Sequence, residues 1–258
     1  MKAHLGRNGF PERFQFLEAP SDITNGDLLL LHSGSGLALA EFWLRKICTD
    51  ELDEKATQEF IEICRRNSLS GYAGITFEAL GLVARTLHRD LIGSIDGSLS
   101  SNEDSLACFW HGVGRGAYFA SDNASPFRSA PWQVLKLCLS GAPHQLAKQN
   151  ALAGLSWALT IINIGQPEIM ANFLKHHAAG LTEEGAFIHG VQSAALIWKY
   201  VAPRDSRIGS FPQYKPEYRN LISHDVWERF VESPFAEACR VGDRLMQKPE
   251  QLFRYRSP

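Results

Sequence analysis

The densest group of chemically active side chains lies between Cys108 and Phe119, in the stretch CFWHGVGRGAYF. His111 and Arg115 are four residues apart, a spacing that places both on one face of an α-helix. Such a pair can bind a carboxylate or stabilise an oxyanion, with His111 available for proton transfer. The pair can instead be structural, with Arg115 bound to a protein carboxylate and His111 bonded to a backbone carbonyl.

A carboxylate that can join this pair is Glu78, which lies in the apolar stretch GITFEALG. Burial would raise its pKa and make it a candidate acid or base, or it would serve as a partner for Arg115. An exposed position is the alternative. We predict Glu78, His111 and Arg115 as a catalytic group that faces one concave pocket. The residues expected to bind substrate are aromatic, small or imidazole-bearing: Trp110, Tyr118, Trp157, Gly112, Gly154, Gly190 and His189.

Three other patterns resemble known sites but lack the context that each requires. Gly112, Gly114 and Gly116 imitate a phosphate-binding loop, without a preceding strand or the right terminal spacing. The stretches LLLLHSGSG (28–36) and GLSWA (154–158) imitate a serine hydrolase, but Ser156 lies inside a helical pattern with no strand before it. The histidines are scattered and form no Glu-x-x-His pair in a predicted helix, so we predict neither a metal nor another cofactor. A metal-dependent oxidase remains an alternative.

These side chains must be positioned by a helical scaffold, which the composition and a repeated glycine pattern predict. The chain has 258 residues, of which 45% are hydrophobic, enough for one large core. Five helix-length segments each contain a glycine before small and aromatic residues, at positions 36, 74, 112, 154 and 190. This near-constant period indicates one repeated supersecondary unit. We therefore predict an all-α domain over residues 25–258, preceded by an arm over residues 1–24.

Each of these glycines costs about 1 kcal/mol of helix propensity relative to alanine. They must therefore gain stability from tertiary contacts, either as close helix crossings or as the walls of a cavity. We expect Gly112, Gly154 and Gly190 to be buried where two helices approach closely.

Charge and cysteine usage limit the partners and the compartment. Lys plus Arg number 26 and Asp plus Glu number 28, which gives no basic surface for nucleic acid or an anionic membrane. The five cysteines are widely spaced, and the first residues lack the apolar run of a signal peptide, so we expect a cytoplasmic location. The longest uncharged stretch, between Lys148 and Glu168, contains too many polar residues for a membrane span.

The order of the glycine segments resembles a family of proteins of unknown function, DUF1702, encoded beside enediyne polyketide synthases. The resemblance rests on HSGSGLALA (32–40), FWHGVGRGAYF (109–119), AGLSWAL (153–159) and FIHGVQSAA (187–195), and covers roughly residues 28–235. This chain departs from the family at Tyr118, where tryptophan is more usual. The resemblance implies an accessory role in making an enediyne or related polyene antibiotic, on a linear polyene or its ring-closed successor.

The resulting hypothesis is a helical protein that encloses an elongated apolar intermediate. If the protein is catalytic, a proton shift, isomerisation or cyclisation needs the fewest additional cofactors. The alternative is a binding or scaffold protein that stabilises a reactive intermediate or a partner enzyme, such as the polyketide synthase. Both versions require a ligand pocket, but only the enzyme requires His111 or Arg115 for turnover.

Overall fold

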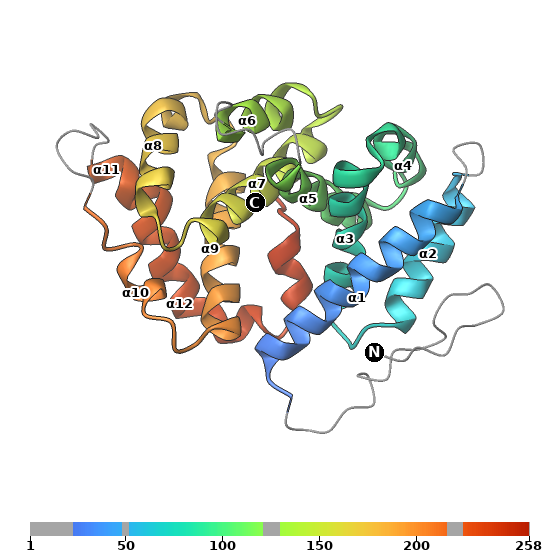
Figure 1. Cartoon of the computed structure of the whole chain (residues 1–258), viewed down its shortest axis with the longest axis horizontal. Coiled ribbons are helices and arrows are strands. Elements are labelled where there is room, and N and C mark those ends of the chain that lie inside the picture. Colours follow the sequence, from blue (N-terminus) through green and yellow to red (C-terminus); the bar gives the residue numbers. More distant parts are fainter. Residues whose placement is uncertain (1–22, 48–51, 121–129, 216–223, 258) are drawn as a thin grey trace.

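The computed structural model describes residues 23–47, 52–120, 130–215 and 224–257, and in these ranges helix is the only regular secondary structure (Figure 1). The predicted all-α fold is confirmed. The first long helix, α1 (Asn25–Lys46), begins after Thr24, whose side chain accepts a hydrogen bond from the backbone of Asp27 in a capping box. The stretch 28–36 therefore belongs to a helix and not to a hydrolase strand. Most of the predicted arm, residues 1–22, lies outside the described residues.

The glycine-bearing segments form five long helices that alternate along the chain with shorter ones. The five are α1, α3 (Ala73–Leu87), α5 (Glu103–Phe119), α7 (Gln145–Ile162) and α9 (Glu184–Val201). Between them lie α2 (Glu54–Arg66), α4 (Ile92–Ser98), α6 (Ala130–Ser140) and α8 (Pro167–His177). The chain ends with α10 (Arg207–Ser210), α11 (His224–Trp227), a π-helical turn (Glu228–Glu232), α12 (Ser233–Leu245) and a 3₁₀ segment (Pro249–Phe253).

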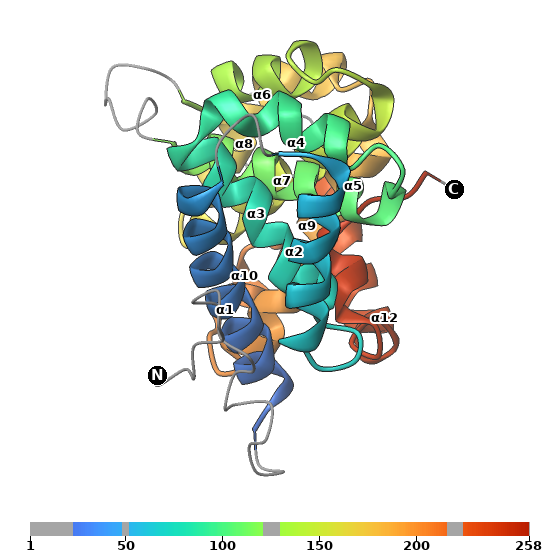
Figure 2. The ribbon, with the colours of Figure 1, turned by 90° about the vertical axis from the view of Figure 1, so that its right-hand side faces the viewer.

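Each glycine-bearing helix packs against the next one along the chain. In α5 and α7, Trp110 lies against His144 at the start of α7, and Tyr118 accepts a hydrogen bond from Asn163 at its end. Successive repeats therefore stack side by side, as expected for a repeat architecture. Figure 2 shows the first repeat edge-on, with α1, α2 and α3 adjacent.

The glycines make these contacts close enough for backbone to touch backbone. A Cβ atom added to Gly112 would lie 2.1 Å from the carbonyl oxygen of Glu78 in α3, and one added to Gly154 would lie 1.9 Å from that of His111 in α5. At Gly190 the added atom would lie 2.0 Å from the hydroxyl of Ser156 in α7. All three glycines are buried, so the expectation of close helix crossings is confirmed.

Stretches rich in Gly, Ser, Pro and Asp predict loops at residues 96–104, 121–131, 141–143, 180–185 and 202–216, and the structure agrees with these predictions only in part. The turn over Gly141–Pro143 separates α6 from α7, but residues 96–98 belong to α4, and residues 207–210 of a predicted loop form α10. Short helical turns of this kind lack the length that a hydrophobic period needs to be recognised. Residues 121–129 of another predicted loop lie outside the described residues.

The last described residues do not add another repeat. After α12 the chain returns across the molecule, and Figure 1 shows this final stretch running through the middle of the fold between α3 and α9. The 3₁₀ segment there contacts α3, α5, α9 and α12. Among the described helices, none is long and apolar enough to cross a membrane.

Candidate functional site

Glu78, His111 and Arg115 meet in the interior, as predicted. The Nδ1 atom of His111 lies 2.9 Å from Oε1 of Glu78, and Arg115 donates from Nη1 to the other carboxylate oxygen at 2.6 Å. Glu78 and His111 are almost fully buried, whereas the Arg115 side chain is 13% exposed. The crossings at Gly112 and Gly154 hold α3, α5 and α7 together at this level, so these glycines position the cluster.

Burial and the mutual contacts of the three side chains set the protonation state of the cluster. Burial by itself would raise the pKa of Glu78, but the charge of Arg115 and the hydrogen bonds from both partners outweigh it and hold the pKa below its ordinary value. Burial also lowers the pKa of His111, against the opposing effect of Glu78. At neutral pH the cluster is therefore an ionised Glu78, a charged Arg115 and a neutral His111.

This state leaves one nitrogen of His111 available. Because an ionised carboxylate can only accept, Nδ1 of His111 carries the proton and donates it to Glu78. The other nitrogen, Nε2, is buried and has no hydrogen-bond partner within the described ranges. His32 provides a contrast: its Nδ1 lies 2.7 Å from the Leu28 carbonyl oxygen, and its Nε2 accepts from the Leu69 backbone at 3.0 Å. Both ring nitrogens of His32 are therefore bonded to the backbone, as in a purely structural histidine, whereas only one ring nitrogen of His111 is bonded.

Aromatic rings cover the cluster. The Arg115 guanidinium lies 4.0 Å from the centre of the Trp157 ring, so Trp157 packs against the cluster. Phe253, from the 3₁₀ segment near the chain end, packs edge-on against His111 with ring centres 5.7 Å apart, and its ring centre is 5.8 Å from the guanidinium carbon. Sequence reasoning missed Phe253, which lies far along the chain in a stretch without helical periodicity.

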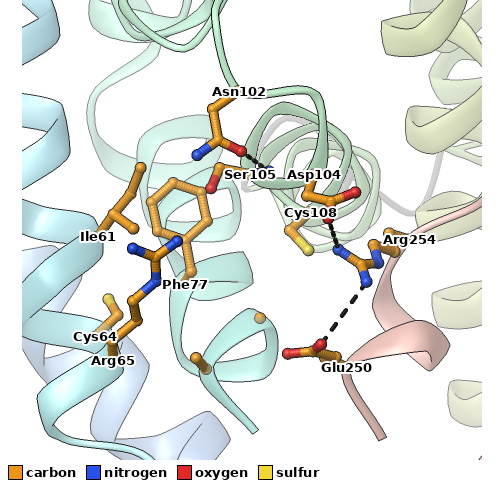
Figure 3. Close-up of a pocket in the computed structure, with 12 residues that line it drawn as sticks. Ile61, Cys64, Arg65, Phe77, Asn102, Asp104, Ser105, Cys108, Glu250 and Arg254 are labelled. Carbon is orange, nitrogen blue, oxygen red and sulfur yellow. Dashed lines mark hydrogen bonds and ion pairs between the residues drawn. The ribbon is translucent and has the colours of Figure 1, made fainter. Parts of the chain in front are cut away.

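The predicted common pocket is replaced by two cavities that flank residues 249–256. One, of about 240 Å³, is polar and lies between α2, α3 and α5 (Figure 3). In it Arg254 bridges Asp104 at 2.7 Å and Glu250 at 3.7 Å. The other, of about 440 Å³, lies between α9 and α12. The residues that line these two cavities do not include Glu78, His111 or Arg115, because Phe253 covers the cluster.

The other predicted substrate-binding residues separate into two groups. His189 lines the larger cavity, and its ring lies against that of Tyr255 in a tilted arrangement, with ring centres 5.7 Å apart. Trp110, in contrast, donates from its indole nitrogen to Asp96 at 2.6 Å, and Tyr118 bonds to Asn163. Their contacts place Trp110 at the α4–α7 side and Tyr118 at the end of α7, so the structure does not bring them to the cluster. In the described ranges, no three His, Cys, Asp or Glu side chains are grouped for a metal ion.

His189 predicts a measurable pH dependence. Burial and the nearby His111 lower its pKa from the ordinary 6.5 to about 3. Because the pKa of His189 is lower in the folded state, the unfolded chain binds more protons between pH 6.5 and pH 3. The contribution of His189 to the free energy of unfolding is therefore fully present above about pH 6.5 and is lost as the pH falls toward 3. Each proton of difference corresponds to about 1.4 kcal/mol per pH unit.

We therefore expect His189→Gln to flatten the loss of unfolding free energy between pH 6.5 and pH 4, measured by urea denaturation at a series of pH values. The matched control is Gln192→Ala, which changes a side chain that lines the same cavity without removing a titratable group, and should leave the slope unchanged. Equal slopes in the wild type and in His189→Gln would contradict the assigned pKa.

Comparisons with protein-family models, with curated proteins and with solved structures find no match to this chain.

Proposed function

We propose that this protein binds an elongated apolar molecule, a polyene-like intermediate of polyketide biosynthesis, and that His111 moves a proton on it. The reaction class is a cofactor-independent isomerisation or cyclisation. The observation that carries this proposal is the free Nε2 atom of His111, buried among aromatic rings while Nδ1 is held by Glu78. The polyene as substrate rests on the resemblance to the family encoded beside enediyne polyketide synthases.

The cluster has the parts that a double-bond shift requires. Nε2 of His111 accepts a proton from an allylic C–H bond, the double bonds move along the chain, and the imidazolium returns a proton at another carbon after its N–H has exchanged with solvent. Electrons and atoms balance without an oxidant. The positive imidazolium that forms in between is stabilised by Glu78 at 2.9 Å, and Arg115 keeps Glu78 ionised throughout.

The larger cavity supplies a place for the molecule beside this cluster. Its walls combine three apolar side chains, Val241 and Leu245 of α12 and Leu252 of the 3₁₀ segment, with polar and charged ones such as Glu237 and Arg256. His189 lines it, and so does Leu252, whose chain neighbour Phe253 packs against His111. An apolar chain in this cavity would reach His111 by taking the place of the neighbouring Phe253 ring.

The variant His111→Gln tests proton transfer separately from ligand binding. With a conjugated tetraene fatty acid as the probe, fluorescence titration should show saturable binding that changes less than about threefold, because glutamine retains a hydrogen-bonding group next to Glu78. Deuterium incorporation from D₂O into the probe should fall by about 10²-fold or more, the usual contribution of general acid–base catalysis. His32→Gln is the control, because both nitrogens of that buried histidine already have partners.

Two results would reject the catalytic proposal: no saturable binding of the tetraene to the wild type, or equal deuterium incorporation in the wild type and His111→Gln. Binding without any incorporation would instead favour the second function, a scaffold that protects a reactive intermediate. The position of Phe253 over His111 favours that alternative, because it excludes water from the cluster. Mass spectrometry of molecules retained by the purified protein then identifies the ligand.

A further inference from the structure

Residues 249–256 lie in the fold as a bound peptide would lie in a groove. The stretch has the sequence PEQLFRYR, begins as the 3₁₀ segment and becomes extended at Arg254. It crosses the face formed by α3, α5 and α9. The two cavities of about 240 and 440 Å³ remain unfilled on its two sides, and Arg254 lines both of them. A core segment would be close-packed on all sides, so these flanking spaces distinguish this stretch from the repeats.

The first contact is a two-point clamp on the backbone. Asn150 of α7, which is fully buried, accepts a hydrogen bond from the backbone N–H of Tyr255 at 2.6 Å. The same side chain donates to the carbonyl oxygen of Tyr255 at 3.2 Å. An amide side chain that pairs with both backbone groups of one residue recognises an extended peptide whatever its side chain.

The second set of contacts recognises two side chains of the segment, Phe253 and Tyr255. Phe253 enters the space between His111, Arg115 and Trp157 and is 2% exposed. Tyr255 lies against His189, and its hydroxyl would be only 2.5 Å from a Cβ atom at Gly185, so the absence of a side chain there makes room for the ring. Two aromatic anchors two residues apart on one face are the usual spacing for an extended peptide.

The third contact is electrostatic. Asp104, at the start of α5, is paired with both Arg254 and Arg256. Burial would raise the pKa of Asp104, but its bonds with these two arginines hold it below the ordinary value. The groove therefore offers a backbone clamp, an aromatic anchor site and an acidic rim, each matched by one feature of the segment.

We propose that this groove is a peptide-binding site whose intramolecular occupant is the 249–256 segment. In trans it takes an extended segment of a partner protein in which an aromatic residue stands next to arginine, with a second arginine two residues further on. The attached segment competes at high effective concentration, so a partner binds well only when the attached segment is weakened or displaced. The anchor site lies beside His111, the residue proposed for proton transfer, but the peptide-binding proposal requires no reaction there.

The test uses the full chain and a fluorescein-labelled peptide of residues 249–257, with binding followed by fluorescence anisotropy. Two chain variants weaken the attached segment: Phe253→Ala, which removes the anchor, and Arg254→Ala/Arg256→Ala, which removes the rim pairs and keeps the buried ring. The labelled peptide should bind both variants at least about tenfold more tightly than the wild type, because the internal competitor is weaker. It should also raise the melting temperature of Phe253→Ala by refilling the anchor site.

Controls distinguish the groove from nonspecific attraction. A peptide carrying Phe253→Ala should lose binding to all chains by about tenfold or more, and Asp104→Asn in the arginine variant should weaken binding and reduce its salt dependence. Equal, weak binding of the peptide to all three chains would overturn the proposal. So would equal binding of the phenylalanine and alanine peptides. Neither result depends on deuterium exchange at His111, so the two proposals fail separately.

Discussion

Replacing Arg115 by methionine is expected to lower the free energy of unfolding by about 3 to 5 kcal/mol, because it leaves the buried carboxylate of Glu78 without its charge partner. The Nη1–Oε2 distance of 2.6 Å and the near-complete burial of Glu78 identify this pair as the critical one. Methionine retains much of the side-chain contact with Trp157 but supplies no charge. Urea denaturation monitored by circular dichroism measures the loss.

The double variant Glu78→Gln/Arg115→Met separates charge from packing. Glutamine removes the negative charge and can still bond to His111, so the double variant should be more stable than Arg115→Met alone. A double variant as unstable as the sum of the two single variants would mean that the ion pair has no coupling energy. The pairing also changes the role expected of Arg115: its charge is committed to Glu78 and not to a ligand carboxylate.

Adding a methyl group at position 154 is expected to destabilise the fold as strongly as Arg115→Met does. Gly154→Ala should lower the free energy of unfolding by more than about 3 kcal/mol, because the new Cβ atom would lie 1.9 Å from the carbonyl oxygen of His111. This loss is at or beyond the upper end of the range for ordinary overpacking. The contact is with backbone, which cannot move aside by changing a rotamer, so α5 and α7 must separate. Gly154→Leu should be worse. Thermal and urea denaturation give the difference in unfolding free energy.

The chain provides a matched control in α1. Gly34 has no atom within 4 Å of an added Cβ and is exposed, so Gly34→Ala should raise stability by up to about 1 kcal/mol through helix propensity. Two residues later, a Cβ at Gly36 would lie 2.3 Å from the Thr76 carbonyl oxygen, and Gly36→Ala should destabilise. Similar effects of alanine at 34, 36 and 154 would show that the helix crossings are not as close as described.

Local patterns in the sequence were sufficient for the features that arise within one helix. The period of the glycines depends on a repeated unit, and the shared face of His111 and Arg115 depends on a spacing of four residues. The structure agrees with both. The apolar stretch of the preceding repeat predicts Glu78 as a partner, because neighbouring repeats contact one another.

Contacts between distant segments were decided only by the tertiary structure. Phe253 covers the cluster, and Asn150 binds the backbone of Tyr255, which is 105 residues away. Trp110 and Tyr118 flank the predicted motif in sequence, yet their side chains bond to Asp96 and Asn163. The physical reason is that helical spacing sets which residues share a face, whereas the direction in which that face points depends on how the helices cross. Here backbone contact at Gly112 and Gly154 sets those crossings.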